Sequence, residues 1–269
     1  PSPQAEDWRL MAAALQAGWP TVAALVKRAA NELVRVPGAA IPGVLAPTIF
    51  FVGLTSVFAG LTELEGFGTD SYESFIIPVS LLQGAGFTGA ATGVNLARDI
   101  EQGWFDRLLA SPAPRPALLA GLVISASVRA LVPAVVLLGV ALAIGAHWPG
   151  FLGLAIAFFG VMAMGTVAAL YGCALALRFR TQAAAPLMQA GMFVGVLMTT
   201  SYAPLELLTG WLHTVAEINP VTHVLEMARQ GFVPGEVTWA ETWPGLVALA
   251  GLMFVFAAFA LRGMHRMAD

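Results

Sequence analysis

The stretch FLGLAIAFFGVMAMGTVAALYGCALAL, residues 151–177, carries no charged side chain in 27 consecutive positions. A helix rises about 1.5 Å per residue, so this length is sufficient for the roughly 30 Å hydrocarbon core of a bilayer. We expect a helix because backbone groups left unpaired in lipid are costly, and the chain shows no alternating barrel pattern. This stretch therefore predicts a membrane-spanning helix.

Five further apolar stretches have a comparable length, and the composition agrees with them. Hydrophobic residues make up 58% of the 269 residues and charged residues only 11%, with a mean hydropathy of +0.78. A soluble domain carries about 25% charged residues. We therefore expect an all-α integral membrane protein. Its six transmembrane helices are expected near residues 39–61, 74–97, 118–145, 151–177, 184–203 and 242–262.

The basic residues are distributed unevenly between the two sides of these spans. Twelve of the 13 lysines and arginines fall on the side that holds both termini, and only Arg229 falls on the other side. The positive-inside rule then places both termini in the cytoplasm. Residues 1–38 are expected to be a cytoplasmic segment without a signal-peptide pattern, 39–262 the transmembrane domain, and 263–269 a cytoplasmic tail.

The N-terminal segment contains an amphipathic pattern, TVAALVKRAANELVRV, residues 21–36. At a helical period its apolar side chains share one face, and Lys27, Arg28 and Arg35 lie on the other. The pattern predicts a helix lying in the membrane interface, with its basic residues toward lipid phosphates. An amphipathic helix packed on protein is the alternative interpretation.

A charged segment, ARDIEQGWFDRLLASPAPRPALL, residues 97–119, separates the second and third spans. Its apolar residues recur at helical spacing, and Pro112, Pro114 and Pro116 then prevent the helix from continuing. The segment predicts a short, rigid cytoplasmic helix. A solvated loop, whose charges only keep it out of the bilayer, is the alternative.

This segment also resembles the corresponding loop of the type-2 ABC exporter permeases. In that family a glutamate and a glycine lead to an arginine, two leucines, a small residue and a proline. The matching residues here are Glu101, Gly103, Arg107, Leu108, Leu109, Ala110, Ser111 and Pro112. Two positions depart from the pattern, because Trp104 stands where threonine is common and Asp106 where glutamate is common.

A second resemblance lies between the fifth and sixth spans, in YAPLELLTGWLHTVAEINPVTHVLEMARQGF, residues 202–232. It is similar to the outer segment of the same family at Pro204, Leu205, Trp211, Leu212, Asn219 and Pro220. Prolines divide the segment into apolar pieces too short to span a bilayer. Their length predicts a re-entrant or interfacial hairpin on the outer side.

The resemblance, to daunorubicin, multidrug-resistance and polysaccharide-export permeases, implies a subunit of a larger complex in a bacterial cytoplasmic membrane. It implies a second permease, identical or different, and a separate ATPase that carries ATP and magnesium, so that this chain binds no cofactor. The coupling helix to that ATPase would comprise Arg98, Asp99, Glu101, Gly103, Trp104, Phe105, Asp106, Arg107, Leu108, Leu109 and Pro112. The family's dimer contact involves the first and fifth spans, which makes Gly191 and Gly195 the interface candidates.

Polar and aromatic side chains within the spans are the candidates for a substrate path. They are Phe51, Phe58, Gln83, Phe87, Thr88, Thr92, Asn95, Gln189, Met192 and Thr199. Interhelical hydrogen bonds and core packing explain these residues equally well. Arg129 is costly at mid-helix, and either snorkels to the inner interface or serves the path.

Signatures of self-contained chemistry are missing from the sequence. It has no G-x-x-x-x-G-K-[ST] motif and a single lysine, Lys27, so we expect no ATPase activity in this chain. The usual hydrolase and zinc-protease motifs are also absent. His223 and Glu226 lie three residues apart with His213 nearby, which is fewer ligands than a metal site needs, and we expect no metal.

We therefore expect a permease of an ATP-driven exporter for an amphipathic or hydrophobic substrate such as a drug, antibiotic or lipid. Contact with membrane lipid is expected, and a nucleic-acid partner is not. A glycan exporter is the alternative within the family. From other classes, an ion-coupled secondary transporter would need acidic residues within the spans, and a membrane enzyme would need a cluster such as His213, Glu217, His223 and Glu226.

Overall fold

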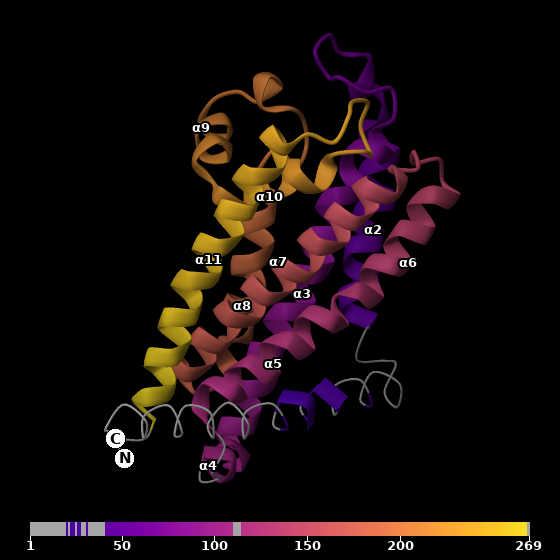
Figure 1. Cartoon of the computed structure of the whole chain (residues 1–269). Coiled ribbons are helices and arrows are strands. Elements are labelled where there is room, and N and C mark those ends of the chain that lie inside the picture. Colours follow the sequence, from indigo (N-terminus) through magenta and orange to yellow (C-terminus); the bar gives the residue numbers. More distant parts are fainter. Residues whose placement is uncertain are drawn as a thin grey trace, which may run out of the picture.

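The fold is a bundle of helices, seen in the computed structural model along its length in Figure 1. The structure describes residues 20, 22–24, 26, 27, 31, 41–109 and 114–267. Every regular element in these residues is a helix and none is a strand, which confirms the all-α prediction for this part of the chain. The interfacial helix predicted within residues 1–38 falls mostly outside the described residues.

Within the described part of the chain, five helices are long and apolar enough to cross a membrane. They are α2 (Ile41–Phe58, continued by η2, Ala59–Glu63), α3 (Tyr72–Glu101), the pair α5 and α6 (Arg115–Arg129 and Leu131–Ala143), α7 (Gly150–Phe179) and α11 (Trp239–His265). The shorter helices are α4 (Trp104–Leu109), η3 (Gln182–Ala184), α8 (Ala185–Leu197), η4 (Leu205–Leu207), α9 (Trp211–Ile218) and α10 (Pro220–Arg229).

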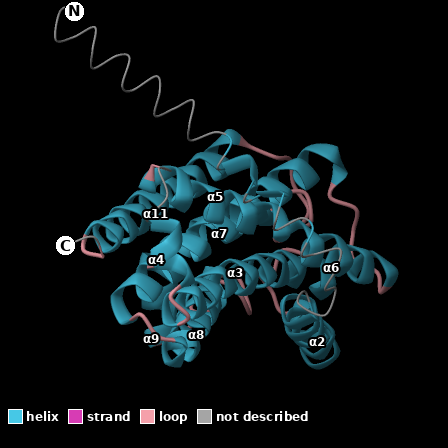
Figure 2. Ribbon diagram, turned by 90° about the horizontal axis from the view of Figure 1, so that it is seen from below, coloured by secondary structure: helices cyan, strands magenta, loops and turns pink. Residues whose placement is uncertain are grey.

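The helix α3 occupies the middle of the bundle, and α2 stands to one side of it (Figure 2). It is buried over most of its length, whereas α2 and α11 are mostly exposed. Its closest neighbour is α7, because Gly93 lies directly against Gly172, where a β-carbon would overlap the Gly172 backbone. Small residues allow membrane helices to approach in this way and to gain dispersion contacts along their length.

The third predicted span is bent where α5 gives way to α6. Ala130 lies between the two helices, and Pro133 follows in the first turn of α6. Proline has no N–H to donate to the carbonyl four residues earlier, here that of Arg129, so the helix bends at this point.

The fifth predicted span is shorter than expected, because α8 ends at Leu197 rather than at residue 203. The apolar helix Gln182–Leu197 rises about 24 Å, less than the roughly 30 Å of a hydrocarbon core. Thr199 and Ser201 each donate a hydroxyl hydrogen bond to the Val196 carbonyl, at 2.6 and 2.7 Å. Such local bonds compete with helix continuation, and the chain turns there. At the C-terminus, α11 extends to His265, three residues beyond the predicted end at 262.

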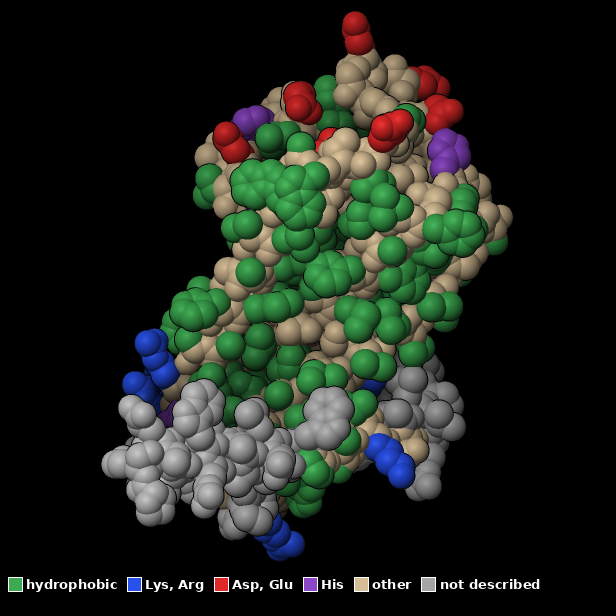
Figure 3. Space-filling view, in the orientation of Figure 1, with side chains coloured by type: hydrophobic (Ala, Val, Ile, Leu, Met, Phe, Trp, Pro, Cys, Tyr) green, Lys and Arg blue, Asp and Glu red, His purple; other side chains and the backbone are tan. Residues whose placement is uncertain are grey.

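Charged side chains gather at opposite ends of the bundle and leave its middle apolar (Figure 3). The end formed by η2, the start of α3, α9 and the start of α11 is called the acidic end; it carries Glu63, Glu65, Asp70, Glu73, Glu206, Glu217, Glu236 and Glu241. The opposite end is called the basic end; its arginines are Arg98, Arg107, Arg115, Arg178, Arg180, Arg262 and Arg266. An apolar belt between two charged ends is the arrangement that suits a bilayer.

Candidate functional site

The segment predicted as a coupling helix begins later than expected. α3 continues to Glu101, so Arg98, Asp99 and Glu101 form its last turn. Gly103, at a φ of 69°, then turns the chain into α4. Residues with a β-carbon rarely adopt this conformation, and a helix cannot continue through it. The separate helix of this segment is therefore α4 alone.

The short helix α4 projects from the basic end of the bundle (Figure 1). Phe105 anchors it, since this side chain is only 1% exposed, and Leu108 and Leu109 pack partly against the core. Its exposed side chains are Trp104, Asp106 and Arg107. The face that α4 offers is thus aromatic and charged. Pro112, the last predicted residue of the segment, lies outside the described residues.

Glu101 ties the end of α3 to the turn between α7 and α8. Its carboxylate accepts hydrogen bonds from the Thr181 hydroxyl at 2.7 Å, the Gln182 backbone N–H at 3.0 Å and the Gln182 side-chain amide at 2.7 Å. Arg98 donates from Nε to the Gln182 side-chain oxygen at 3.2 Å. Hydrogen bonds to a carboxylate are stronger than those between neutral groups. The base of α4 and the start of α8 are therefore held together.

Sequence reasoning did not identify Thr181 and Gln182. A signal for them exists, because the short polar stretch RFRTQ interrupts two apolar runs and Thr181 stands at a helix start. Thr181 indeed caps η3 by accepting from the Ala183 backbone N–H at 3.2 Å.

Aromatic side chains from three helices meet beside α3 in the apolar belt. Phe87 of α3 stacks on Phe193 of α8 at 6.0 Å between ring centroids, and Phe50 of α2 meets Phe193 edge-on at 5.7 Å. Met192, which is 7% exposed, precedes Phe193 and packs against Gly86, the neighbour of Phe87 in α3. Of the predicted path residues, Phe87 and Met192 are thus brought together, while Phe50 and Phe193 each lie one residue from a predicted position.

The other predicted path residues differ in their burial. Phe51, Gln83 and Thr199 are buried, Thr88 and Gln189 are partly buried, Asn95 is exposed, and Phe58 packs near Tyr72 at the acidic end. Thr92 is also buried, where its hydroxyl accepts a hydrogen bond of 2.8 Å from Arg129 of α5. Arg129 therefore reaches across to α3, so part of its hydrogen-bonding capacity is satisfied within the protein.

The two glycines predicted at a dimer interface have different surroundings. Gly191 lies against the Tyr171 side chain of α7, within the same chain. Gly195 has open space where a β-carbon would be. Only Gly195 is thus left open within the protomer, and the role of both residues at an interface stays a prediction.

At the acidic end, Asn219 joins the end of α8 to the start of α10. Its side-chain amide donates to the carbonyls of Gly195 and Met198, at 2.9 and 2.8 Å. Its side-chain oxygen accepts from the Val221 backbone N–H at 3.0 Å, and Pro220 occupies the first position of α10. One side chain therefore satisfies both helix ends, which explains an Asn-Pro pair at this point.

Among the described residues, Arg229 is the one arginine at the acidic end; it is buried and bonded to α10 and its neighbours. Its side chain is 4% exposed and pairs with the Glu226 carboxylate at 2.7 Å. It also donates to the backbone carbonyls of Thr200 at 2.8 Å and Phe75 at 3.3 Å, and lies over the Phe75 ring at 3.9 Å. The Thr200 hydroxyl donates to the same Glu226 oxygen. Buried charge is tolerated because it is paired and hydrogen-bonded.

This cluster lines a cavity of about 450 Å³ at the acidic end, bounded also by Pro204, Glu217 and His223. Trp211, at the start of α9, is exposed. The Tyr72 hydroxyl donates a hydrogen bond to the carbonyl of Tyr202 at 3.3 Å. This bond connects the stretch that follows α8 to the start of α3. Partial burial raises the pKa of the Tyr202 hydroxyl, because the charged form would lose hydration there.

The sequence pattern of one family, described as ABC-2 type transporter, matches residues 20–233. The chain belongs to the ABC-2 type transporter family. The match contains α4, the Glu101 contacts and the acidic-end segment through Arg229. It confirms the predicted type-2 ABC permease, and together with the five long apolar helices it makes the chain an integral membrane protein.

Individual relatives agree with this family. The "Daunorubicin resistance ABC transporter permease protein DrrB1" of Streptomyces coeruleorubidus is 27% identical over 227 residues, 81% of this chain and 77% of that protein. The "Probable doxorubicin resistance ABC transporter permease protein DrrC" of Mycobacterium tuberculosis is 27% identical over 256 residues, 90% and 86% of the two chains. The "Probable multidrug ABC transporter permease YbhR" of Escherichia coli K12 is 28% identical over 189 residues, 66% of this chain and 50% of that protein.

Proposed function

We propose that this ABC-2 chain is the membrane-spanning subunit of an ATP-driven exporter whose ATP and magnesium are bound by a separate ATPase. Its relatives are named as ABC transporter permeases, which supports a transport subunit. The sequence itself contains no phosphate-binding G-x-x-x-x-G-K-[ST] loop. The chemical energy then has to enter through a contact with another polypeptide.

We infer that the basic end faces the cytoplasm. The apolar belt is flanked by arginines on one side and carboxylates on the other, the asymmetry that the positive-inside rule describes. Arg229 does not oppose this orientation, since it is buried and paired with Glu226. Both chain termini belong to the cytoplasmic side in this arrangement.

The observation that carries the proposal is the geometry of α4. It protrudes at the basic end, is anchored by buried Phe105 and exposes Trp104, Asp106 and Arg107. An aromatic ring flanked by charges is typical of a protein–protein contact. In the proposed complex α4 docks on the ATPase, and the Glu101 hydrogen bonds connect that contact to α8.

The aromatic cluster of Phe50, Phe87 and Phe193 supports an amphipathic or hydrophobic substrate, such as a drug, antibiotic or lipid. Flat apolar rings bind apolar ring systems by stacking and burial. The cluster lies between α2 and α8, the two helices proposed to meet a second permease, identical or different. The substrate path is therefore placed along this face of α3.

Co-purification with the ATPase encoded beside this chain tests the docking contact. We expect Asp106→Arg to reduce bound ATPase at least tenfold, because it reverses an exposed charge on α4 while leaving the buried Phe105 anchor in place. The matched control is Glu236→Arg, the same reversal at the acidic end, which should retain wild-type binding. Vanadate-sensitive ATP hydrolysis in lipid, measured on the same samples, reports whether the complex is active.

Equal ATPase binding by Asp106→Arg, Glu236→Arg and wild type would contradict docking through α4. Loss of binding in Glu236→Arg, with wild-type binding in Asp106→Arg, would contradict the assignment of the basic end to the cytoplasm. Drug transport into inverted vesicles then tests the substrate class, with a glycan substrate as the competing outcome.

A further inference from the structure

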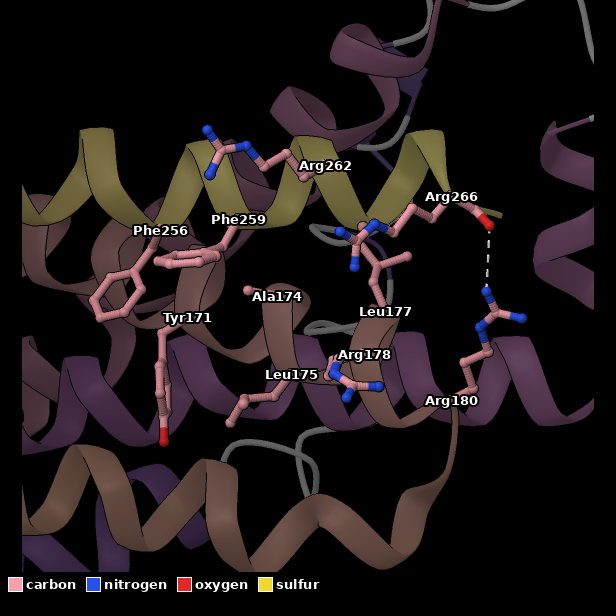
Figure 4. A pocket seen from close by; sticks show the side chains of 11 residues that line it. Tyr171, Ala174, Leu175, Leu177, Arg178, Arg180, Phe256, Phe259, Arg262 and Arg266 are labelled. Carbon is pink, nitrogen blue, oxygen red and sulfur yellow. Dashed lines mark hydrogen bonds between the residues drawn. The ribbon is translucent and has the colours of Figure 1, made fainter. Parts of the chain in front are cut away.

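A groove lies between α7 and α11 at the basic end, and the function proposed above assigns no role to it. Its volume is about 580 Å³ (Figure 4). One half is apolar, where Phe256 and Phe259 of α11 face Tyr171 of α7. Tyr171 and Phe256 meet edge-on at 5.3 Å between ring centroids.

The other half is lined by four arginines. Arg178 and Arg180 come from the end of α7 and the turn after it, and Arg262 and Arg266 from the end of α11. All four are exposed, and none of the described residues that line the groove is acidic. Among the described residues, the one ion pair is Arg229–Glu226 at the acidic end. None of the four groove arginines therefore forms an ion pair with a described carboxylate.

The hydrogen bond shown in Figure 4 leaves most of this charge available. Arg180 donates to the backbone carbonyl of Arg266 at 3.4 Å, which neutralises nothing. The C-termini of α7 and α11 contribute about half a negative charge each from the helix dipoles. Four full positive charges exceed that sum, so the groove attracts an anion. Arginine binds phosphate oxygens in a bidentate manner.

The two halves are separated by a distance that fits an amphiphile. Arg178 follows Tyr171 by seven positions, and Arg266 follows Phe259 by seven, which is roughly 10 Å along each helix axis. Figure 4 shows the rings of Tyr171, Phe256 and Phe259 toward one end of the groove and Arg180 and Arg266 toward the other. A ligand that fills both halves needs a phosphate next to an apolar chain.

We propose that the α7–α11 groove binds one anionic phospholipid from the leaflet that faces the basic end. Its phosphate contacts Arg262 and Arg266, with Arg178 and Arg180 on the opposite wall, and one acyl chain lies over Phe259 toward Tyr171. Basic pockets between membrane helices bind lipid headgroups in this way. The lipid is a bound structural ligand of the permease and is distinct from its transported substrate.

Native mass spectrometry of the purified chain, titrated with phosphatidylglycerol, tests the site. The variant Arg262→Gln/Arg266→Gln should bind this lipid on the order of 30-fold more weakly, since each arginine near a lipid phosphate contributes a roughly fivefold effect. The control Arg107→Gln/Arg115→Gln removes two arginines from the same end outside the groove. It should stay within about twofold of wild type. Equal weakening in the two double variants would show unspecific charge attraction and overturn the proposal.

Further binding measurements identify the ligand. Ala174→Trp fills the apolar half without changing the charge, and should also weaken phosphatidylglycerol binding, with thermal unfolding checking that the variant is folded. Inorganic phosphate in excess should fail to displace the lipid, and phosphatidylcholine should bind more weakly than phosphatidylglycerol. Unchanged affinity in folded Ala174→Trp, displacement by phosphate, or equal binding of the two lipids would each overturn the proposal. None of these binding measurements involves the ATPase, so their outcome is independent of the proposed export function.

Discussion

The variant Glu226→Ala tests whether the buried charge at the acidic end depends on its partner. Arg229 is 4% exposed and Glu226 41% exposed, so removing the carboxylate leaves the less hydrated charge without its counter-ion. Breaking a buried pair costs about 3–5 kcal/mol. The guanidinium keeps the carbonyls of Thr200 and Phe75, at 2.8 and 3.3 Å, and the Phe75 ring. We therefore expect the lower end of that range, about 3 kcal/mol of unfolding free energy.

Reversible unfolding in mixed micelles, followed by tryptophan fluorescence, measures this loss. Glu217→Ala is the matched control, because Glu217 is an exposed carboxylate that lines the same cavity; it should change stability by less than about 0.5 kcal/mol. Adding Arg229→Met to Glu226→Ala removes the unpaired charge and should restore roughly 2 kcal/mol, a coupling that a double-mutant cycle isolates. If Glu226→Ala matches the control, the reasoning about the buried guanidinium is refuted.

Three more outcomes are expected from contacts between helices. Gly93→Ala places a methyl group into the Gly172 backbone and should cost more than about 3 kcal/mol in the same unfolding assay, whereas Gly195→Ala meets open space and should be tolerated. Asn219→Ala leaves two carbonyls and one N–H unpaired and should lower the unfolding free energy by about 2–4 kcal/mol. Unchanged stability would show that water replaces the amide, and would contradict this expectation. Glu101→Ala should leave the ATPase bound but reduce substrate-stimulated ATP hydrolysis severalfold; unchanged stimulation would contradict a connecting role for its hydrogen bonds.

The length of the apolar stretches and the distribution of the charged residues were sufficient to predict much of this fold. Long uncharged stretches reveal helices such as α7 because the bilayer fixes a minimum length. The same measure overestimated the length of α8. Thr199 and Ser201 are mild enough in hydropathy to extend an apolar stretch, yet their hydroxyls bond to the Val196 carbonyl where the helix ends. Helix ends therefore depend on side-chain hydrogen bonds that hydropathy does not register.

The candidate site shows the same limit. Glu101 was predicted as a contact to another protein because its position matches a family pattern, whereas its hydrogen-bond partners lie 80 and 81 residues further along the chain. Residue type indicates that a carboxylate will find donors, and only the packing of α3 beside η3 determines which donors these are. Arg229 was predicted to lie on the side opposite to the other basic residues. Its burial against Phe75 was not predicted, because it depends on a contact between residues 154 positions apart.

The fastening of α8 at both of its ends restricts how the protein can move. Next to its first turn, Glu101 fastens η3 to α3, and at its last turn the Asn219 amide holds two carbonyls at 2.9 and 2.8 Å. A slide of α8 by about 1 Å along its axis, with its neighbours fixed, would lengthen the Asn219 bonds to nearly 4 Å, beyond hydrogen-bonding distance. Either those bonds break or α10 moves with α8, and Arg229 and the cavity beside it follow. The basic and acidic ends of the bundle are thus connected through α8, and any shift of α8 that keeps these hydrogen bonds moves elements at both ends.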